Sequence, residues 1–137
     1  MRDIEISSYE GFGYRPMIDY QTWRVAILNY CEELETPNLK TMQKHMETDE
    51  VFILLRGSCT LFTGGSMEKI GNIEATIMEP LKLYNVKRGV WHTHTLDREG
   101  MVAIVENKDT SDANSPTIEL SAKQREQIHL LDCMEKK

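Results

Sequence analysis

The sequence predicts an all-β domain, a sandwich or a barrel, that ends in one helix. Short runs rich in β-branched and aromatic residues follow one another at even spacing, separated by turn residues. No helical periodicity appears between them, and a helix signal stands only near the end of the chain. Many short strands at such spacing are typical of antiparallel sandwiches and barrels.

The elements follow in chain order. Residues 5–20, which include a Gly-Phe-Gly-Tyr-Arg-Pro run, indicate an irregular arm or an edge piece. Gly64-Gly65 signals a hairpin, and residues 97–100 form a polar turn that ends in glycine. The predicted strands cover residues 22–30, 39–45, 50–55, 58–63, 70–77, 82–86, 90–96 and 101–106, with 117–120 as a candidate last edge strand.

A helix is predicted over about residues 121–134. Ser121 stands at the N-cap position and Gln124 follows three residues later, which is a capping box. Ile128 and Leu131, with Leu130 beside them, give an apolar stripe at helical spacing. We expect this helix to pack against the outside of the barrel, with a dimer contact as the alternative.

Length and composition predict one domain over residues 1–137. The net charge is −6 and the basic residues are scattered, which argues against nucleic acid or an anionic membrane as a partner. No apolar run approaches the roughly 20 residues of a membrane helix, and the N-terminus lacks the order of a signal peptide. The odd set Cys31, Cys59 and Cys133 implies no disulfide framework. A cytoplasmic protein with reduced thiols is expected.

Two of the predicted strands carry histidines. His92 and His94 are two residues apart and must point to the same face, as must Gln43 and His45. If both strands line one cavity, these side chains and the carboxylate of Glu50 could converge there. The odd spacing between His45 and Glu50 means that the chain must turn or bulge between them.

These stretches resemble the two motifs of the cupin superfamily. In the first motif, His45 matches the second histidine of a His-x-His pair, Glu50 follows after four intervening residues, and Gly57 closes the motif. In the second motif, Gly89 and His92 match. The resemblance covers roughly residues 23–107. It implies a jelly-roll barrel and a homodimer.

The chain departs from both motifs. Gln43 replaces the first histidine and Pro37 stands where the leading glycine would be. Lys87 replaces the proline of the second motif, and Leu96 its asparagine. By the resemblance, the family's metal ligands map to Gln43, His45, Glu50 and His92. His94, which lies outside the motif, is a candidate to restore a third imidazole.

Chemistry indicates a divalent metal independently of the resemblance. Two histidines and one carboxylate leave open positions for a substrate, as in non-haem iron sites, and the same ligands take Mn, Ni or Zn. Occupancy is expected to fall as the pH drops through the histidine range. The alternative is a metal-free cavity in which the histidines only form hydrogen bonds and Glu50 is a solvated turn residue.

The function expected is that of a small-molecule-binding cupin, a divalent-metal-dependent enzyme acting on a small polar metabolite such as a sugar or an organic acid. Glu50 or His94 would serve as base. The alternative is a metabolite-binding or sensing cupin that uses no metal and catalyses nothing. Further candidates are Arg24 and Arg56 for an anionic group of the ligand, Tyr84 as a proton donor, and Glu106 as a partner of a histidine.

Overall fold

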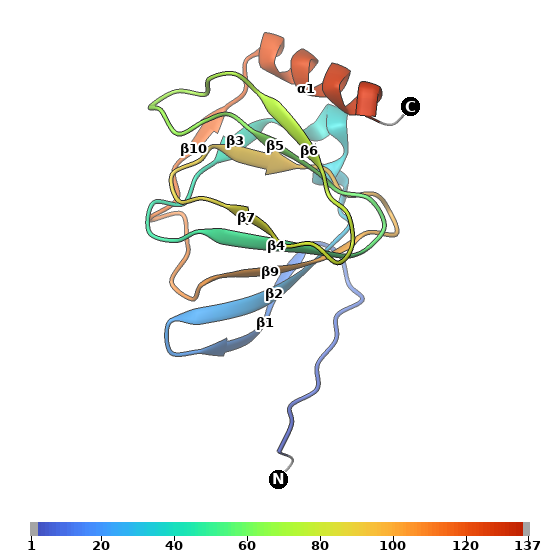
Figure 1. Ribbon diagram of the computed structural model, residues 1–137, viewed down its shortest axis with the longest axis vertical. Coiled ribbons are helices and arrows are strands. Elements are labelled where there is room, and N and C mark those ends of the chain that lie inside the picture. Colours follow the sequence, from blue (N-terminus) through green and yellow to red (C-terminus); the bar gives the residue numbers. More distant parts are fainter. Residues whose placement is uncertain (1–2, 136–137) are drawn as a thin grey trace.

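Two antiparallel five-stranded sheets pack face to face in the computed structural model, which describes residues 3–135 (Figure 1). The first sheet has the order β1-β2-β9-β4-β7 and the second the order β10-β3-β8-β5-β6. Apart from the neighbouring pairs β1–β2 and β5–β6, consecutive strands lie in opposite sheets, as in a jelly-roll barrel. The predicted all-β jelly roll with a C-terminal helix is therefore confirmed.

The observed strands overlap the predicted ones, although several of them are shorter. The first sheet contains β1 (Tyr14–Tyr20), β2 (Trp23–Asn29), β9 (Met101–Asn107), β4 (Glu50–Arg56) and β7 (Tyr84–Val86). The second contains β10 (Thr117–Glu119), β3 (Thr41–Gln43), β8 (His92–His94), β5 (Thr60–Thr63) and β6 (Glu74–Ile77). Two short 3-10 turns (Glu32–Leu34 and Thr36–Asn38) and α1 (Ala122–Glu135) complete the described chain.

Of the two alternatives for residues 5–20, an irregular arm or an edge piece, the edge piece is correct for residues 14–20. They form β1, which pairs with β2 along its length, although the register shifts between Pro16 and Ile18. An edge strand tolerates a proline and a bulge because one side of its backbone needs no partner. Residues 5–10 have no regular structure and lead away from the barrel (Figure 1).

The hairpin signalled at Gly64-Gly65 is formed by β5 and β6, but its loop is much longer than these two glycines. β6 begins only at Glu74. The Gly71 N–H donates to the Gly64 carbonyl at 2.8 Å, and Ile73 is buried in the core. The apolar residues of this segment therefore fold back onto the barrel instead of extending the strand.

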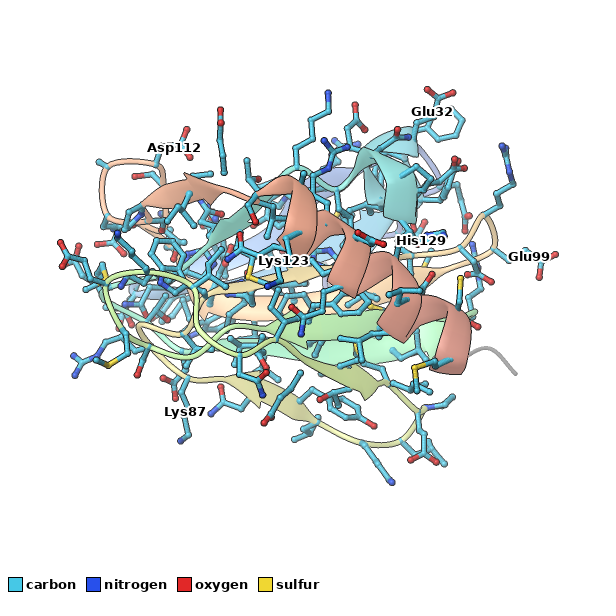
Figure 2. All side chains as sticks on the ribbon, turned by 90° about the horizontal axis from the view of Figure 1, so that it is seen from above. Glu32, Lys87, Glu99, Asp112, Lys123 and His129 are labelled. Atoms are coloured by element: carbon cyan, nitrogen blue, oxygen red, sulfur yellow. The ribbon has the colours of Figure 1, made fainter. Side chains whose placement is uncertain are left out.

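The predicted helix packs on the outside of the second sheet, as expected (Figure 1). Its capping box forms: the Gln124 N–H donates to Ser121 Oγ at 3.1 Å, and the Ser121 N–H donates to Gln124 Oε1 at 2.9 Å. Ile128 is buried, whereas His129 lies on the exposed face (Figure 2). No helix among residues 3–135 has the length and apolar character needed to span a membrane.

Glycine closes the first motif for a steric reason. Gly57 has a φ of +79°, in the left-handed region, and a Cβ there would lie 2.5 Å from Asp97 Oδ1 and 2.6 Å from Gly100 Cα. Gly65 has a similar φ of +77° but open space around it. The turn after β4 therefore needs glycine both for its backbone angle and for its packing.

Replacing Gly57 by alanine should lower the free energy of unfolding by about 2–4 kcal/mol, because backbone strain and overpacking add. Gly65→Ala is the matched control and should cost about 1 kcal/mol, since it carries the strain alone. Urea unfolding of both variants measures the difference. Equal losses would contradict the packing argument.

Candidate metal centre

A cavity of about 460 Å³ opens between the two sheets. One part of its wall is apolar and includes Leu28, Phe52 and Ile104, whereas the 110–112 segment is polar. All five candidate metal ligands from the sequence line it, namely Gln43, His45, Glu50, His92 and His94. The two histidine-bearing stretches therefore do face one cavity.

Three of these side chains meet at one point. Glu50 Oε1 lies 3.1 Å from His45 Nε2 and 2.9 Å from His92 Nε2, and all three residues are buried. Their potential ligand atoms lie within 4.8 Å of one another. Two bonds of about 2.1 Å at right angles place neighbouring ligand atoms about 3 Å apart. The distances to Glu50 fit that arrangement.

Local backbone structure brings the three residues together. β3 ends at Gln43 and β4 begins at Glu50, so the chain turns in residues 44–49 and overcomes the odd spacing between His45 and Glu50. The Gly89 N–H donates to the His45 carbonyl at 2.8 Å and ties the second motif to the first. Gln43 lies opposite His92 in the strand register.

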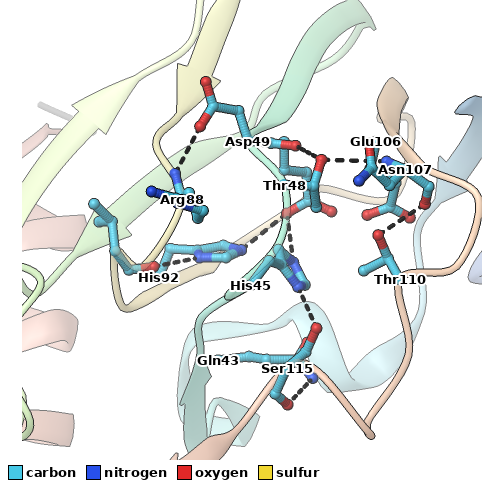
Figure 3. Close-up of polar contacts among 12 residues, drawn as sticks. Gln43, His45, Thr48, Asp49, Arg88, His92, Glu106, Asn107, Thr110 and Ser115 are labelled. Atoms are coloured by element: carbon cyan, nitrogen blue, oxygen red, sulfur yellow. Dashed lines mark hydrogen bonds and ion pairs between the residues drawn. The ribbon is translucent and has the colours of Figure 1, made fainter. Parts of the chain in front are cut away.

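The second ring nitrogen of each histidine has its own partner (Figure 3). His92 Nδ1 lies 3.0 Å from the Val90 carbonyl, which can only accept, so this nitrogen carries a proton. His45 Nδ1 lies 2.7 Å from Ser115 Oγ, and that hydroxyl donates to Asn114 Oδ1 at 3.1 Å. The hydroxyl therefore accepts from His45.

These contacts fix the tautomers of the neutral rings. With Nδ1 protonated, both neutral imidazoles aim an Nε2 lone pair at the region of the Glu50 carboxylate. Two lone pairs and an anionic oxygen repel one another unless a proton or a cation lies between them. The donor set therefore fits a metal ion, with Ser115 and the Val90 carbonyl holding the rings in place.

When no cation is bound, the negative charge of Glu50 is balanced by a proton on His45. Burial opposes ionisation of Glu50, but its contacts with the His45 and His92 rings hold its pKa well below the usual range. Burial would lower the pKa of His45, but the hydrogen bond to Glu50 and its negative charge outweigh burial and raise the pKa. A metal ion must therefore displace a proton from His45.

A second buried carboxyl group lies beside Glu50. Glu106 Oε2 accepts hydrogen bonds from the Tyr14 hydroxyl at 2.7 Å and from Arg24 Nη2 at 2.6 Å. Burial and the neighbouring Glu50 raise the pKa of Glu106. We expected Glu106 to contact a histidine and Arg24 to be available to a ligand. Instead, Arg24 and Glu106 form an ion pair with each other.

His94 and Gln43 line the cavity but stand outside the group of three. The His94 ring packs on Phe52, with centroids 5.3 Å apart, and neither of its nitrogens has a hydrogen-bond partner among residues 3–135. Burial lowers the pKa of His94 to about 4. Gln43 Nε2 donates to the Ser115 carbonyl at 3.0 Å. Their roles as metal ligands stay predictions.

Two of the candidate residues from the sequence lie away from the cavity, and two residues that contact the site were not predicted. The Tyr84 hydroxyl accepts from the Glu79 N–H at 2.9 Å, outside the cavity wall, and Arg56 pairs with Glu10 on the surface. Tyr14 and Ser115 reach the site from far along the sequence. Neither carried a signal, because Tyr14 lies in the supposed arm and Ser115 in a polar loop.

Comparison with solved structures identifies the fold. A cupin-2 domain protein from Shewanella frigidimarina is 16% identical with a TM-score of 0.52, and the match covers 74% of this chain and 85% of that one. KdgF from Halomonas sp. is 10% identical with a TM-score of 0.51, over 73% of this chain and 81% of that one. The protein therefore has the fold of the cupin superfamily, as its two motifs indicated.

The nucleoside dehydratase Pac13 is another structural neighbour. It is 6% identical with a TM-score of 0.55, and the match covers 84% of this chain and 86% of that one. Variants of Pac13 from Streptomyces have been solved with uridine. No protein-family model matches the sequence, and no curated protein matches it either. At these identities the likeness concerns the fold alone.

The raised pKa of His45 predicts a pH dependence of the metal-free protein. The stabilising effect of the protonated His45 beside Glu50 is complete below about pH 6.5 and is lost as the pH rises through the raised value. Glu50 stays ionised over this range because its pKa is lowered. Relative to His45→Gln, the chelator-treated wild type should therefore lose unfolding free energy as the pH rises above about 6.5 and through the raised pKa of His45.

Urea unfolding at each pH measures this difference. His129→Gln, at an exposed position on α1, is the control and should run parallel to the wild type. If the unfolding free energy of His45→Gln depends on pH in the same way as that of the wild type, His45 does not carry the proton that pairs with Glu50.

Proposed function

We propose that this protein binds a divalent metal through His45, Glu50 and His92 and acts as an enzyme on a small polar metabolite held in the cavity. The observation that carries the proposal is the pair of Nε2 lone pairs aimed at one buried carboxylate. A metal at this point would polarise a carbonyl or hydroxyl oxygen of the ligand. Iron, manganese, nickel and zinc all suit such ligands.

The cavity wall supports a small ligand with an apolar part and several hydroxyl or carbonyl groups. Phe52 and Ile104 offer apolar contact, and Thr41 and Thr93 offer hydroxyl groups. His94 adds a ring whose two nitrogens have no partner among the described residues, so a ligand can hydrogen-bond to it. A sugar or an organic acid fits this description, and Pac13 with uridine is a neighbour of related fold.

Metal content tests the proposal. Protein purified without chelator or added metal should carry about one iron, manganese, nickel or zinc ion per chain, and His92→Ala should lose it while the barrel stays folded. His129→Ala, an exposed histidine outside the barrel, is the matched control and should keep the metal. Elemental analysis and circular dichroism give the two readings. Full metal content in His92→Ala would show that the ligands are assigned wrongly.

Gln43 offers a second test. Because Gln43 lies opposite His92 and lines the cavity, Gln43→His should add an imidazole and tighten metal binding about tenfold or more. Competition with a chromogenic chelator measures the affinity. Unchanged affinity would mean that position 43 does not reach the metal.

The alternative is a metabolite-binding cupin without metal. The Gln43 amide, which donates to the Ser115 carbonyl where the family has a ligand histidine, favours it. Glu50 would then be held by the two histidines alone. Protein that stays metal-free when each metal is offered would move the proposal to this class.

A further inference from the structure

The cavity of the candidate metal centre has acidic groups in its wall but little free positive charge. The carboxyl groups of Glu50, Glu106 and Asp112 line it, and among the described residues of the wall only Arg24 is permanently cationic. A carboxylate accepts hydrogen bonds and cannot donate them, whereas a hydroxyl group does both. The wall is therefore rich in acceptors, which suits a ligand that brings donors.

The guanidinium of Arg24 is already engaged by the protein. Nε and Nη2 donate to Glu106 Oε2 at 3.0 and 2.6 Å, and Nη2 also donates to the Thr110 carbonyl at 3.2 Å. Nη1 donates to the Lys108 carbonyl at 3.2 Å. A guanidinium has five N–H groups, so a single one, on Nη1, remains for a ligand.

One remaining N–H group cannot hold an organic acid in the usual way. Arginine binds a carboxylate or a phosphate strongly through two parallel N–H groups. The Arg24 side chain is only 16% exposed, and its guanidinium carbon lies 5.6 Å from the centre of the Tyr14 ring. These contacts hold the guanidinium against Glu106. The arginine of the cavity therefore serves the protein's own carboxyl group and not a ligand's.

The remaining wall suits the two kinds of surface that a sugar presents. Leu28, Phe52 and Ile104 belong to the first sheet and offer an apolar surface to the C–H groups of a ring. Thr41 of the second sheet and Asp112 of the 110–112 segment offer oxygen atoms to hydroxyl groups. A volume of about 460 Å³ is sufficient for a molecule of this size.

We propose that the ligand of this cavity is an uncharged polyhydroxylated molecule of the size of a sugar, and that the Arg24–Glu106 ion pair makes the cavity discriminate against organic acids. This inference rests on the proposed function and narrows its ligand class. The hydroxyl groups of such a ligand donate to the acidic wall. An acid would instead bring another negative charge to that wall and would meet no free pair of N–H groups.

A bound divalent metal does not reverse this preference. Its two positive charges are offset by Glu50 and by the exposed Asp112, while Arg24 and Glu106 offset each other. The formal charge of the occupied cavity is then zero. A neutral ligand keeps this balance, and an acid disturbs it.

Binding of matched pairs of compounds tests the ligand class. The pairs are glucose and glucuronate, galactose and galacturonate, and uridine and uridine monophosphate. We expect at least one neutral compound to bind the full-length protein and its charged counterpart to bind about tenfold or more weakly, as measured by isothermal titration calorimetry. Tighter binding of the charged compounds, or no binding by any neutral one, would overturn the inference.

Glu106→Gln tests the role of the ion pair. An amide cannot balance the charge of Arg24, so the affinity for the charged compound should rise about tenfold or more relative to that for its neutral counterpart. Glu10→Gln is the matched control, because Glu10 pairs with Arg56 on the surface, and it should leave this ratio unchanged. An unchanged ratio in folded Glu106→Gln would refute the role of the ion pair. If this variant does not fold, the wild-type pairs still decide the ligand class.

The metal content of the same samples separates this inference from the proposed function. Protein that holds metal but prefers the charged compounds would contradict the inference and leave the proposed function standing. Protein that takes up no metal but prefers the neutral compounds would support the ligand class and contradict the metal-dependent enzyme.

Discussion

The carboxylate of Glu50, shared between two buried imidazoles, is the interaction on which the rest of the site depends. A buried anion is costly unless it is paired and hydrogen-bonded. Here the pairing joins Glu50 on β4 of the first sheet to His92 on β8 of the second sheet and to His45 in the turn after β3. The Ser115 hydroxyl and the Val90 carbonyl then hold the outer nitrogens of the rings. The barrel thus keeps three donor atoms close together at the wall of its cavity.

A second layer of contacts surrounds this carboxylate. Glu106 lies next to Glu50 and is held by Arg24 and Tyr14, so two carboxyl groups share one buried region with a single guanidinium. The arginine balances part of their charge and leaves the imidazoles as the partners of Glu50. The same first sheet carries these groups on its inner face and an uncharged apolar surface on its outer face.

The sequence was sufficient for most of the fold and for the centre of the site. The short β-branched runs predicted most strands, because alternation is strong where one side of a strand is buried, as in β4 and β9. For β1 the sequence left an irregular arm and an edge piece as alternatives, because Pro16 and the preceding glycines look like a loop, although an edge strand accepts them. The loop after Gly64 was missed because only tertiary packing brings Ile73 into the core.

The neighbours of the site could not be predicted, since the fold alone creates them. Ser115 is 70 residues from His45, and Tyr14 is 92 residues from Glu106. No local pattern marks such pairs. The motifs placed His45, Glu50 and His92 on one cavity, and the cavity does contain them, whereas their role as ligands stays a prediction, as does that of His94.

Anomalous X-ray diffraction from crystals of the metal-loaded protein would test the central claim most directly. We predict one strong peak in the cavity within about 2.0–2.2 Å of His45 Nε2, His92 Nε2 and a Glu50 carboxylate oxygen. A peak bound elsewhere, or a cavity in which Glu50 still accepts hydrogen bonds from both histidines at saturating metal, would contradict the account.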